Sequence, residues 1–295
     1  MRLVTFRKSG RLELNIGALR DGDNAVLDLA AADAAFAGGN MAALIAGGAA
    51  VIARAGEAMA KAPVVADATL CAPIPRPAKN IFCVGKNYHE HAKEFASSGF
   101  DATAKEVVPE APVVFSKPPT SVIGPGEPIP SFLDPTNSTD YEGEIAVVIG
   151  KGGRGISKAD AYAHVFGYTI VNDVTARTLQ HKHRQWILGK GIDGFCPMGP
   201  AILTADAAGT PPKLSLSTWV NGELRQRAPV EDLIFDIPTL IEAISAGITL
   251  EPGDIIATGT PAGVGLGFQP AKFLKPGDVV RIEVPGIGVL ENPVA

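Results

Sequence analysis

The sequence from residue 140 to residue 149 reads Asp140-Tyr141-Glu142-Gly143-Glu144-Ile145-Ala146-Val147-Val148-Ile149. Its second half is an apolar and mostly β-branched run, which is typical of a buried strand. Its first half places two acidic residues, Glu142 and Glu144, two positions apart, so that both side chains point to one face of a strand. The stretch therefore predicts a buried strand that carries a pair of carboxylates at its beginning.

Two carboxylates this close repel each other unless a cation neutralises them or one of them stays protonated. A third, Asp173, ends an expected strand over residues 168–172, and it would join the pair if the two strands are neighbours. A set of carboxylates favours a hard ion, Mg²⁺ or Mn²⁺, over Zn²⁺. The alternative is a solvated strand face, with Asp173 capping a helix that begins near Thr175. The residues alone leave both interpretations open.

The overall composition narrows the class of protein. Lys and Arg number 26 and Asp and Glu number 31, and a net charge of −5 argues against binding to a nucleic-acid backbone. No apolar stretch approaches the roughly 20 residues of a membrane-spanning helix, and the N-terminus lacks the apolar core of a signal peptide. The three cysteines, Cys71, Cys83 and Cys196, have no metal-binding or redox spacing. We expect a soluble cytoplasmic protein with reduced thiols.

The chain divides into two expected domains, a small one over residues 1–72 and a catalytic one over residues 73–295, joined by a proline-rich linker at 72–77. In the first we expect strands at 2–8, 12–16 and 24–29, and two short helices between 30 and 61. In the second we expect strands at 81–85, 145–149, 168–171, 255–258 and 279–284, and helices at 87–95, 158–165 and 237–246. A hairpin is expected around Asn221-Gly222, and a mobile surface stretch at 96–112.

Three further groups of residues could carry chemistry. His91 and Glu94 are three residues apart on an expected helix, so the carboxylate can orient the imidazole and the pair can activate water. Lys190 lies between two glycines, where its amine could bind a carboxylate or an enolate oxygen. Gly259 and Thr260 follow a strand and offer N–H and hydroxyl donors for an anion. Each group alone is also compatible with an ordinary surface helix, a turn lysine or a plain turn.

Taken together and in this order, these segments resemble the fumarylacetoacetate hydrolase family. The resemblance covers residues 78–295 and rests on several short stretches. They are Val84-Gly85-Lys86-Asn87-Tyr88, Phe115-Ser116-Lys117-Pro118, Tyr141-Glu142-Gly143-Glu144, Asn172-Asp173-Val174-Thr175-Ala176-Arg177, Gly189-Lys190, Cys196-Pro197-Met198-Gly199-Pro200, Gly253-Asp254-Ile255-Ile256 and Thr258-Gly259-Thr260-Pro261-Ala262-Gly263-Val264. The order of these stretches is specific to the family. It indicates the reaction less clearly.

The resemblance implies an α+β, β-rich fold, in which a mixed β-roll forms the catalytic domain and a small α/β domain precedes it. It also implies a homodimer. Glu142, Glu144 and Asp173 would hold one divalent ion, Mg²⁺ or Mn²⁺, in each chain. A further acidic ligand found in the larger eukaryotic hydrolase has no counterpart in this sequence, so a water would complete the shell.

The resemblance also implies roles for the remaining candidates. The catalytic residues would be His91 and Glu94, on a lid that orders when substrate binds, together with Lys190, which would touch the substrate carboxylate or enolate. The substrate-binding residues would be Thr260, Gly259 and Lys117. A binding protein with a degenerate site would have lost a carboxylate or the lysine, and this sequence has lost none of them.

The chemistry that the resemblance implies passes through the enolate of a 2-oxo acid. We predict a divalent-metal-dependent hydrolase that cleaves a C–C bond in an acylpyruvate or 2,4-dioxo acid, similar to fumarylacetoacetate or fumarylpyruvate, and releases pyruvate or a related acid. One alternative is an oxaloacetate decarboxylase. Another is an isomerase of 2-hydroxyhepta-2,4-diene-1,7-dioate type in aromatic catabolism. The expected partners are the small acid and a second copy of the chain, without nucleic acid or membrane.

Overall fold

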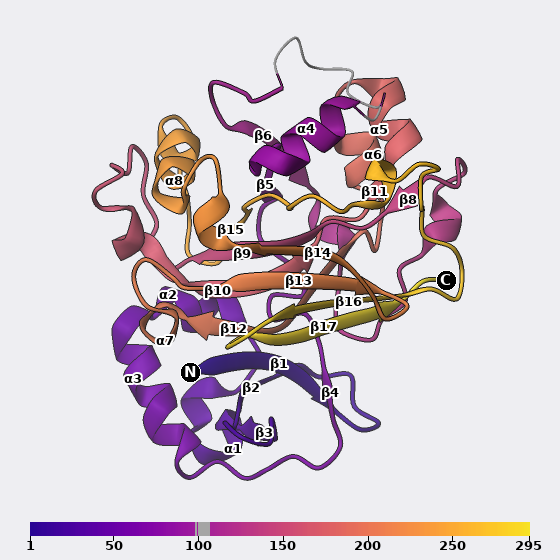
Figure 1. Cartoon of the computed structure of the whole chain (residues 1–295). Helices are drawn as coiled ribbons and strands as arrows, with labels where there is room; N and C mark the ends of the chain where they lie inside the picture. The colour runs from indigo at the N-terminus through magenta and orange to yellow at the C-terminus, as the bar shows by residue number, and fades with distance from the viewer. Residues whose placement is uncertain (98, 100–106) are drawn as a thin grey trace.

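The computed structural model describes residues 1–97, 99 and 107–295, and its main element is one large mixed sheet (Figure 1). The strands of this sheet are β1 Arg2–Lys8, β2 Asn15–Leu19, β3 Val26–Asp28, β4 Ala68–Leu70, β5 Ile81–Gly85, β6 Val113–Lys117, β7 Val122–Ile123, β9 Gly143–Ile149, β10 Val165–Asn172, β12 Cys196–Thr204 and β15 Ile255–Ala257. They follow the order β3-β2-β1-β12-β10-β9-β15-β5-β6, with β4 beside β1 and β7 beside β12. The pairs β5–β15 and β7–β12 are parallel and the other pairs are antiparallel.

A second sheet packs against the first. Its strands are β13 Ser215–Val220, β14 Glu223–Pro229, β16 Val279–Val284 and β17 Gly288–Pro293, in the order β14-β13-β16-β17. A short pair joins β8 Thr139–Asp140 to β11 Thr175–Ala176. Both sheets contribute to the main core. Strand β9 is apolar on both faces because a hydrophobic core lies against each of them. Ile145 and Val147 belong to the core shared with the second sheet, whereas Ala146 and Val148 belong to the core on the other face.

Short helices cover the ends and edges of these sheets. The α-helices are α1 Leu29–Ala32, α2 Met41–Ala46, α3 Gly48–Met59, α4 His89–Ser97, α5 Arg177–His183, α6 Ile187–Lys190, α7 Ala205–Ala208 and α8 Ile237–Ser245. The 3₁₀ helices are η1 Ala34–Phe36, η2 Pro119–Ser121, η3 Ser131–Leu133, η4 Ala161–His164, η5 Val230–Asp232 and η6 Gly265–Gly267. In Figure 1, α4, α5 and α6 gather at the end of the molecule opposite the N-terminal strands. The α+β, sheet-rich fold expected from the sequence is confirmed.

The N-terminal segment extends the large sheet. In β1, Arg2 and Leu3 pair with Leu203 and Ile202 of β12, so the first strands continue the sheet of the rest of the chain (Figure 1). One hydrophobic core also contains side chains from both parts, for example Leu3 and Ala146. The two parts therefore share one sheet and one core. The domain boundary at residue 72 stays a prediction.

Most of the expected elements of the second part are confirmed. The hairpin β13–β14 turns at Asn221-Gly222, where both residues have positive φ, 51° and 79°, as a type I′ turn requires. Helix α8 begins where the Asp236 side chain accepts a hydrogen bond from the Thr239 N–H, and its range matches the expected helix at 237–246. Residues 98 and 100–106, within the stretch expected to be mobile, lie outside the described residues.

Three expectations of local structure were wrong. The helix expected at 158–165 is a turn followed by η4, because Ser157 and Asp160 bond to each other and Lys158 is held by α8 through Glu242. The strand expected at 12–16 begins later and is β2, Asn15–Leu19. Pairing of β2 with β1 places Ile16 in the core, whereas Leu12 lies outside the strand and is exposed. The region expected to hold two helices contains α1, η1, α2 and α3.

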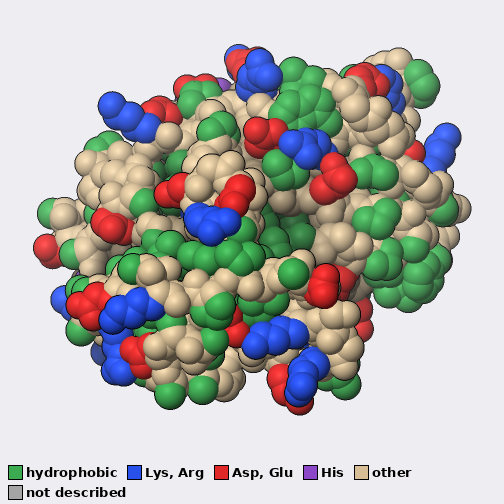
Figure 2. Space-filling model, turned by 90° about the horizontal axis from the view of Figure 1, so that it is seen from below, with side chains coloured by type: hydrophobic (Ala, Val, Ile, Leu, Met, Phe, Trp, Pro, Cys, Tyr) green, Lys and Arg blue, Asp and Glu red, His purple; other side chains and the backbone are tan. Residues whose placement is uncertain are grey.

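The three thiols are free and buried, and burial raises the pKa of Cys196 to about 12. Within the described part of the chain, we find no helix with the length and apolarity needed to span a bilayer. The face seen from below the N-terminal strands has hydrophobic side chains around a hollow, and acidic and basic side chains are interspersed over it (Figure 2).

Candidate active site

A cavity lies where β9 begins, between that strand, α4 and the α5–α6 region. The space between the surrounding atoms, with the open solvent at its mouth included, is about 290 Å³. The side chains and backbone that line it come from β5, α4, β6, β9, α5, α6 and the loop after β15. They are Val84, Gly85, Lys86, His91, Phe95, Phe115, Glu142, Glu144, Arg177, Gln180, Trp186, Lys190 and Thr260.

The three acidic residues that the sequence singled out converge at this cavity. Strands β9 and β10 are hydrogen-bonded neighbours, with Val171 opposite Glu144, so Asp173 at the end of β10 lies beside the pair. One carboxylate oxygen from each of Glu142, Glu144 and Asp173 lies within 4.8 Å of the others, and all three residues are buried. The alternative, a helix cap at Asp173, does not apply because α5 begins only at Arg177.

Buried cations hold two of these carboxylates. Lys190 Nζ lies 2.6 Å from Glu142 Oε2 and 2.7 Å from Asp173 Oδ2, and Arg177 Nη1 lies 2.6 Å from Glu142 Oε1. Burial acts to raise the pKa of Glu142, but Lys190 and Arg177 outweigh it and lower that pKa to about 2. Burial likewise opposes the charge of Lys190, yet Asp173 and Glu142 raise the pKa of its amine. The amine and the Glu142 carboxylate therefore stay charged.

Glu144 lies in a different environment. Its Oε2 accepts a hydrogen bond from the Gly259 N–H at 2.9 Å. Burial, and after it the charges of Asp173 and Glu142, raise the pKa of Glu144 well above its usual value. This repulsion among buried carboxylates is what a divalent cation would relieve, and an all-oxygen donor set suits Mg²⁺ or Mn²⁺. The residues present therefore fit a divalent ion, and the assignment of the three as its ligands stays a prediction.

The structure also brings together the expected acid–base pair. His91 Nδ1 lies 3.1 Å from Glu94 Oε2 within α4, and His91 lines the cavity. The Gly263 N–H donates to Glu94 Oε1 at 3.0 Å, which anchors the carboxylate from the other side. Because Glu94 engages Nδ1, Nε2 is the ring nitrogen that can exchange a proton with a ligand.

The two residues expected after β15 take different positions. Gly259 acts on Glu144 through its N–H, as described above. Thr260 lines the cavity, and its Oγ1 donates to the Gly143 carbonyl at 2.9 Å. Thr260 is therefore placed to contact a ligand, and Gly259 to orient a carboxylate.

Lys117 is placed differently from what the resemblance implied. Its amine is fully buried, lies 2.7 Å from Asp173 Oδ1 and donates to the carbonyls of Val174, at 3.0 Å, and Lys190. It is not among the residues that line the cavity. This geometry favours a role behind Asp173, holding that carboxylate in place, over contact with the substrate.

Lys117→Met is expected to lower the free energy of unfolding by about 3–5 kcal/mol, because it leaves the buried Asp173 carboxylate without one of its cations. Chemical denaturation of the metal-free protein would measure this loss. Lys93→Met is the matched control, since its ion pair with Glu90 is exposed, and it should leave stability unchanged. Equal stabilities of the Lys117 and Lys93 variants would contradict the buried role of Lys117.

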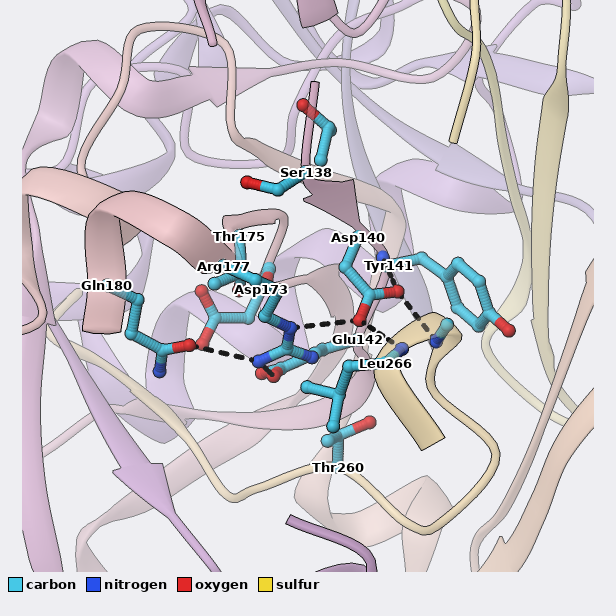
Figure 3. A network of polar contacts seen from close by, with 12 residues as sticks. Ser138, Asp140, Tyr141, Glu142, Asp173, Thr175, Arg177, Gln180, Thr260 and Leu266 are labelled. Carbon is cyan, nitrogen blue, oxygen red and sulfur yellow. Dashed lines mark hydrogen bonds and ion pairs between the residues drawn. The ribbon is translucent and has the colours of Figure 1, made fainter. Parts of the chain in front are cut away.

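A further part of the site, which was not predicted from the sequence, is the network around Arg177 (Figure 3). The Arg177 guanidinium lies between Asp140, Gln180 and Glu142, with Nε 2.9 Å from Asp140 Oδ2 and Nη1 3.2 Å from Gln180 Oε1. Asp140 in turn accepts hydrogen bonds from the N–H groups of Gly265 and Leu266. Arg177 ends one of the stretches that resemble the family and stands four residues after Asp173, and these are the signals that could have identified it.

The structural and sequence comparisons point to one family. The sequence profile that matches the chain is described as "Fumarylacetoacetate (FAA) hydrolase C-terminal", and it covers residues 80–295. Oxaloacetate tautomerase YisK from Bacillus subtilis is 53% identical over 230 residues, which are 78% of this chain and 74% of that protein.

Several solved structures resemble the whole chain. The fumarylacetoacetate hydrolase of Exiguobacterium antarcticum has a TM-score of 0.83 and 40% identity, over 100% of this chain and 99% of that one. The maleylpyruvate hydrolase of Sphingobium sp. SYK-6, solved with manganese(II) and pyruvate, has a TM-score of 0.79 and 32% identity, over 100% of this chain and 99% of that one. These neighbours show that the fold is the one expected from the resemblance.

Proposed function

The chain belongs to the fumarylacetoacetate hydrolase family, and from this premise we propose that it interconverts the keto and enol forms of oxaloacetate with the help of a divalent cation. The observation that carries the proposal is the placement of an acid–base pair, His91 and Glu94, at the same cavity as the buried carboxylates and Lys190. The name of the Bacillus subtilis relative, oxaloacetate tautomerase, supports the choice of substrate.

The reaction moves one proton between carbon 3 and the oxygen on carbon 2. His91 is the base that takes the carbon-bound proton, through Nε2, and the Glu94 carboxylate stabilises the imidazolium that forms. The charged amine of Lys190 lies at the cavity, where it stabilises the negative oxygen of the enolate. The returning proton reaches the oxygen from the same imidazolium or from solvent.

Glu142, Glu144 and Asp173 would hold the cation. When bound, it supplies a Lewis acid that stabilises negative charge on the oxygens of a 2-oxo acid. Arg177 forms an ion pair with Glu142, and Lys117 forms one with Asp173, so each cation positions one of these carboxylates.

Hydrolysis of a C–C bond, the first prediction from the sequence, is the second candidate. The specific observation in its favour is the same His91–Glu94 pair, because hydrolysis needs a base that activates water. The name of the Sphingobium neighbour, maleylpyruvate hydrolase, and the pyruvate in its structure agree with that chemistry. The decarboxylase and isomerase alternatives stay predictions that the same assay distinguishes.

The test uses metal-stripped protein with and without added Mg²⁺ or Mn²⁺. Decay of the ultraviolet absorbance of enol-oxaloacetate reports tautomerisation, and a coupled dehydrogenase reports pyruvate released from oxaloacetate, acetylpyruvate or fumarylpyruvate. We expect metal-dependent acceleration of the enol decay that exceeds any release of pyruvate. Faster release of pyruvate from an acylpyruvate would make the protein a hydrolase, and faster release from oxaloacetate a decarboxylase. Either result would overturn the proposal.

Several finer predictions accompany this proposal. We propose that one Mg²⁺ or Mn²⁺ binds per chain, that the substrate is a small 2-oxo acid, and that the enzyme acts as a homodimer in the cytoplasm. The manganese in the Sphingobium neighbour and the buried acidic triad support the first of these.

A further inference from the structure

A buried glutamine of β14 connects two parts of the site. Gln226 is 1% exposed and is not among the residues that line the cavity. Its Oε1 accepts a hydrogen bond from the Gly143 N–H at 3.0 Å, and its Nε2 donates to Thr260 Oγ1 at 2.7 Å and to the Pro261 carbonyl at 2.8 Å. Gly143 is the residue between Glu142 and Glu144, and Thr260 lines the cavity.

The hydrogen-bond partners of Gln226 determine the positions of the oxygen and the nitrogen of its side-chain amide. The Gly143 N–H can only donate and the Pro261 carbonyl can only accept, so Oε1 must face Gly143 and Nε2 must face Pro261. Nε2 then also donates to Thr260 Oγ1. The single hydroxyl proton of Thr260 is left for the Gly143 carbonyl, 2.9 Å away.

These contacts form a closed ring. The Gly143 N–H donates to Gln226, Gln226 donates to Thr260, and Thr260 donates back to the Gly143 carbonyl. Hydrogen bonds arranged in this way polarise and strengthen one another. Gly143 cannot be replaced by a residue with a side chain without a shift, because a Cβ at this position would collide with Thr218 Oγ1.

We propose that Gln226 is a positioning residue that fixes the direction of the Thr260 hydroxyl proton, so that Thr260 meets a ligand only as a hydrogen-bond acceptor. A carboxylate oxygen has no proton to offer to such a group, whereas an enol hydroxyl has one. The ring therefore favours a ligand with a hydroxyl on the carbon beside its carboxylate, which is the enol form of a 2-oxo acid. This inference rests on the proposed function, and it reverses the expectation that the Thr260 hydroxyl donates to an anion.

The test compares two small acids that bind without turnover. Glycolate carries a hydroxyl beside its carboxylate, and oxalate carries no hydroxyl. Calorimetric titration of the Mn²⁺-loaded protein measures the ratio of the glycolate association constant to the oxalate association constant. Gln226→Met frees the Thr260 proton to turn toward a carboxylate, so we expect this ratio to fall about fivefold, the effect of one hydrogen bond. An unchanged ratio would overturn the proposal.

A double-mutant cycle separates action through Thr260 from other routes. Thr260→Val removes the acceptor, so it should lower the ratio as well, and adding Gln226→Met in that background should lower it no further. A second fall of equal size in the ratio would show that Gln226 acts independently of Thr260. A tenfold loss of Mn²⁺ affinity in Gln226→Met would show that Gln226 acts through the carboxylates. Either result would contradict the proposal. If Gln226→Met does not fold, an unchanged ratio in Thr260→Val alone overturns it.

Asn292 offers a matched control for the loss of a buried amide. It is 1% exposed, and its Nδ2 donates to the carbonyls of Gly124 and Glu127, both at 2.8 Å. Asn292→Leu should lower the melting temperature and leave the ratio unchanged; a fall in the ratio there would show that any loss of stability shifts it. Because binding needs no turnover, a protein with the expected ratios but no tautomerisation would contradict only the proposed function.

Discussion

Glu144→Gln is expected to abolish metal-dependent turnover of every 2-oxo acid, with a loss of at least about a thousandfold. The substitution keeps the shape of the side chain but removes one of three carboxyl groups whose oxygens lie within 4.8 Å of one another. Relief of the repulsion among buried carboxylates should leave the fold intact and make the metal-free protein no less stable. Mn²⁺ binding measured by calorimetry should weaken together with activity.

The control for this substitution is the same chemical change at an exposed position. Glu231→Gln in η5 removes an exposed carboxylate and should leave both Mn²⁺ binding and turnover as they are. Full activity of the Glu144→Gln protein would remove Glu144 from the ligand set. Loss of activity with undiminished Mn²⁺ affinity would point to a role in proton transfer instead.

His91→Gln is expected to lower the rate of tautomerisation by about 10²–10⁴-fold, the usual contribution of a general acid–base group. Glutamine retains a polar side chain but cannot carry a proton from carbon to oxygen. Binding of oxalate to the Mn²⁺-loaded variant should change little, because the carboxylates and Lys190 are untouched. Stopped-flow measurement of enol decay and a titration with oxalate would check the two halves of this prediction.

His89→Gln is the matched control, because His89 begins the same helix and is exposed. It should retain full activity. Any hydrolysis of an acylpyruvate should fall further in His91→Gln than any decarboxylation of oxaloacetate, since only hydrolysis needs an activated water. Equal losses in both side reactions would argue against the His91–Glu94 pair as the base.

Local features of the chain were predictable because they depend on neighbouring residues. The β-branched run after Glu144 forms a strand buried on both faces, and Asn221-Gly222 forms the type I′ turn. The spacing of His91 and Glu94 places them in hydrogen-bonding contact along one helix. The helix expected at 158–165 does not form, because contacts with α8, about 80 residues away in the chain, outweigh the local helix propensity of this segment.

The role of a charged residue was less predictable from its position in the chain. Lys117 and Lys190 both stand in stretches that resemble the family, yet only Lys190 lines the cavity, whereas Lys117 lies behind Asp173. Gln226 carried no signal at all, because its partners Gly143 and Thr260 are 83 and 34 residues away. Hydrogen bonds between such distant segments exist only once the two sheets have packed.

The sequence by itself determined the periodicity of the strands, the turn at Asn221-Gly222, and the set of carboxylates, imidazole and amine from which a site could be built. Only the tertiary structure decided which of these share a cavity and what charge they carry. Pairing of β9 with β10 brings Asp173 to Glu142 and Glu144, and burial removes the water that would screen them. In that low-dielectric setting the neighbours of each group set its protonation, and neighbours are a property of the fold.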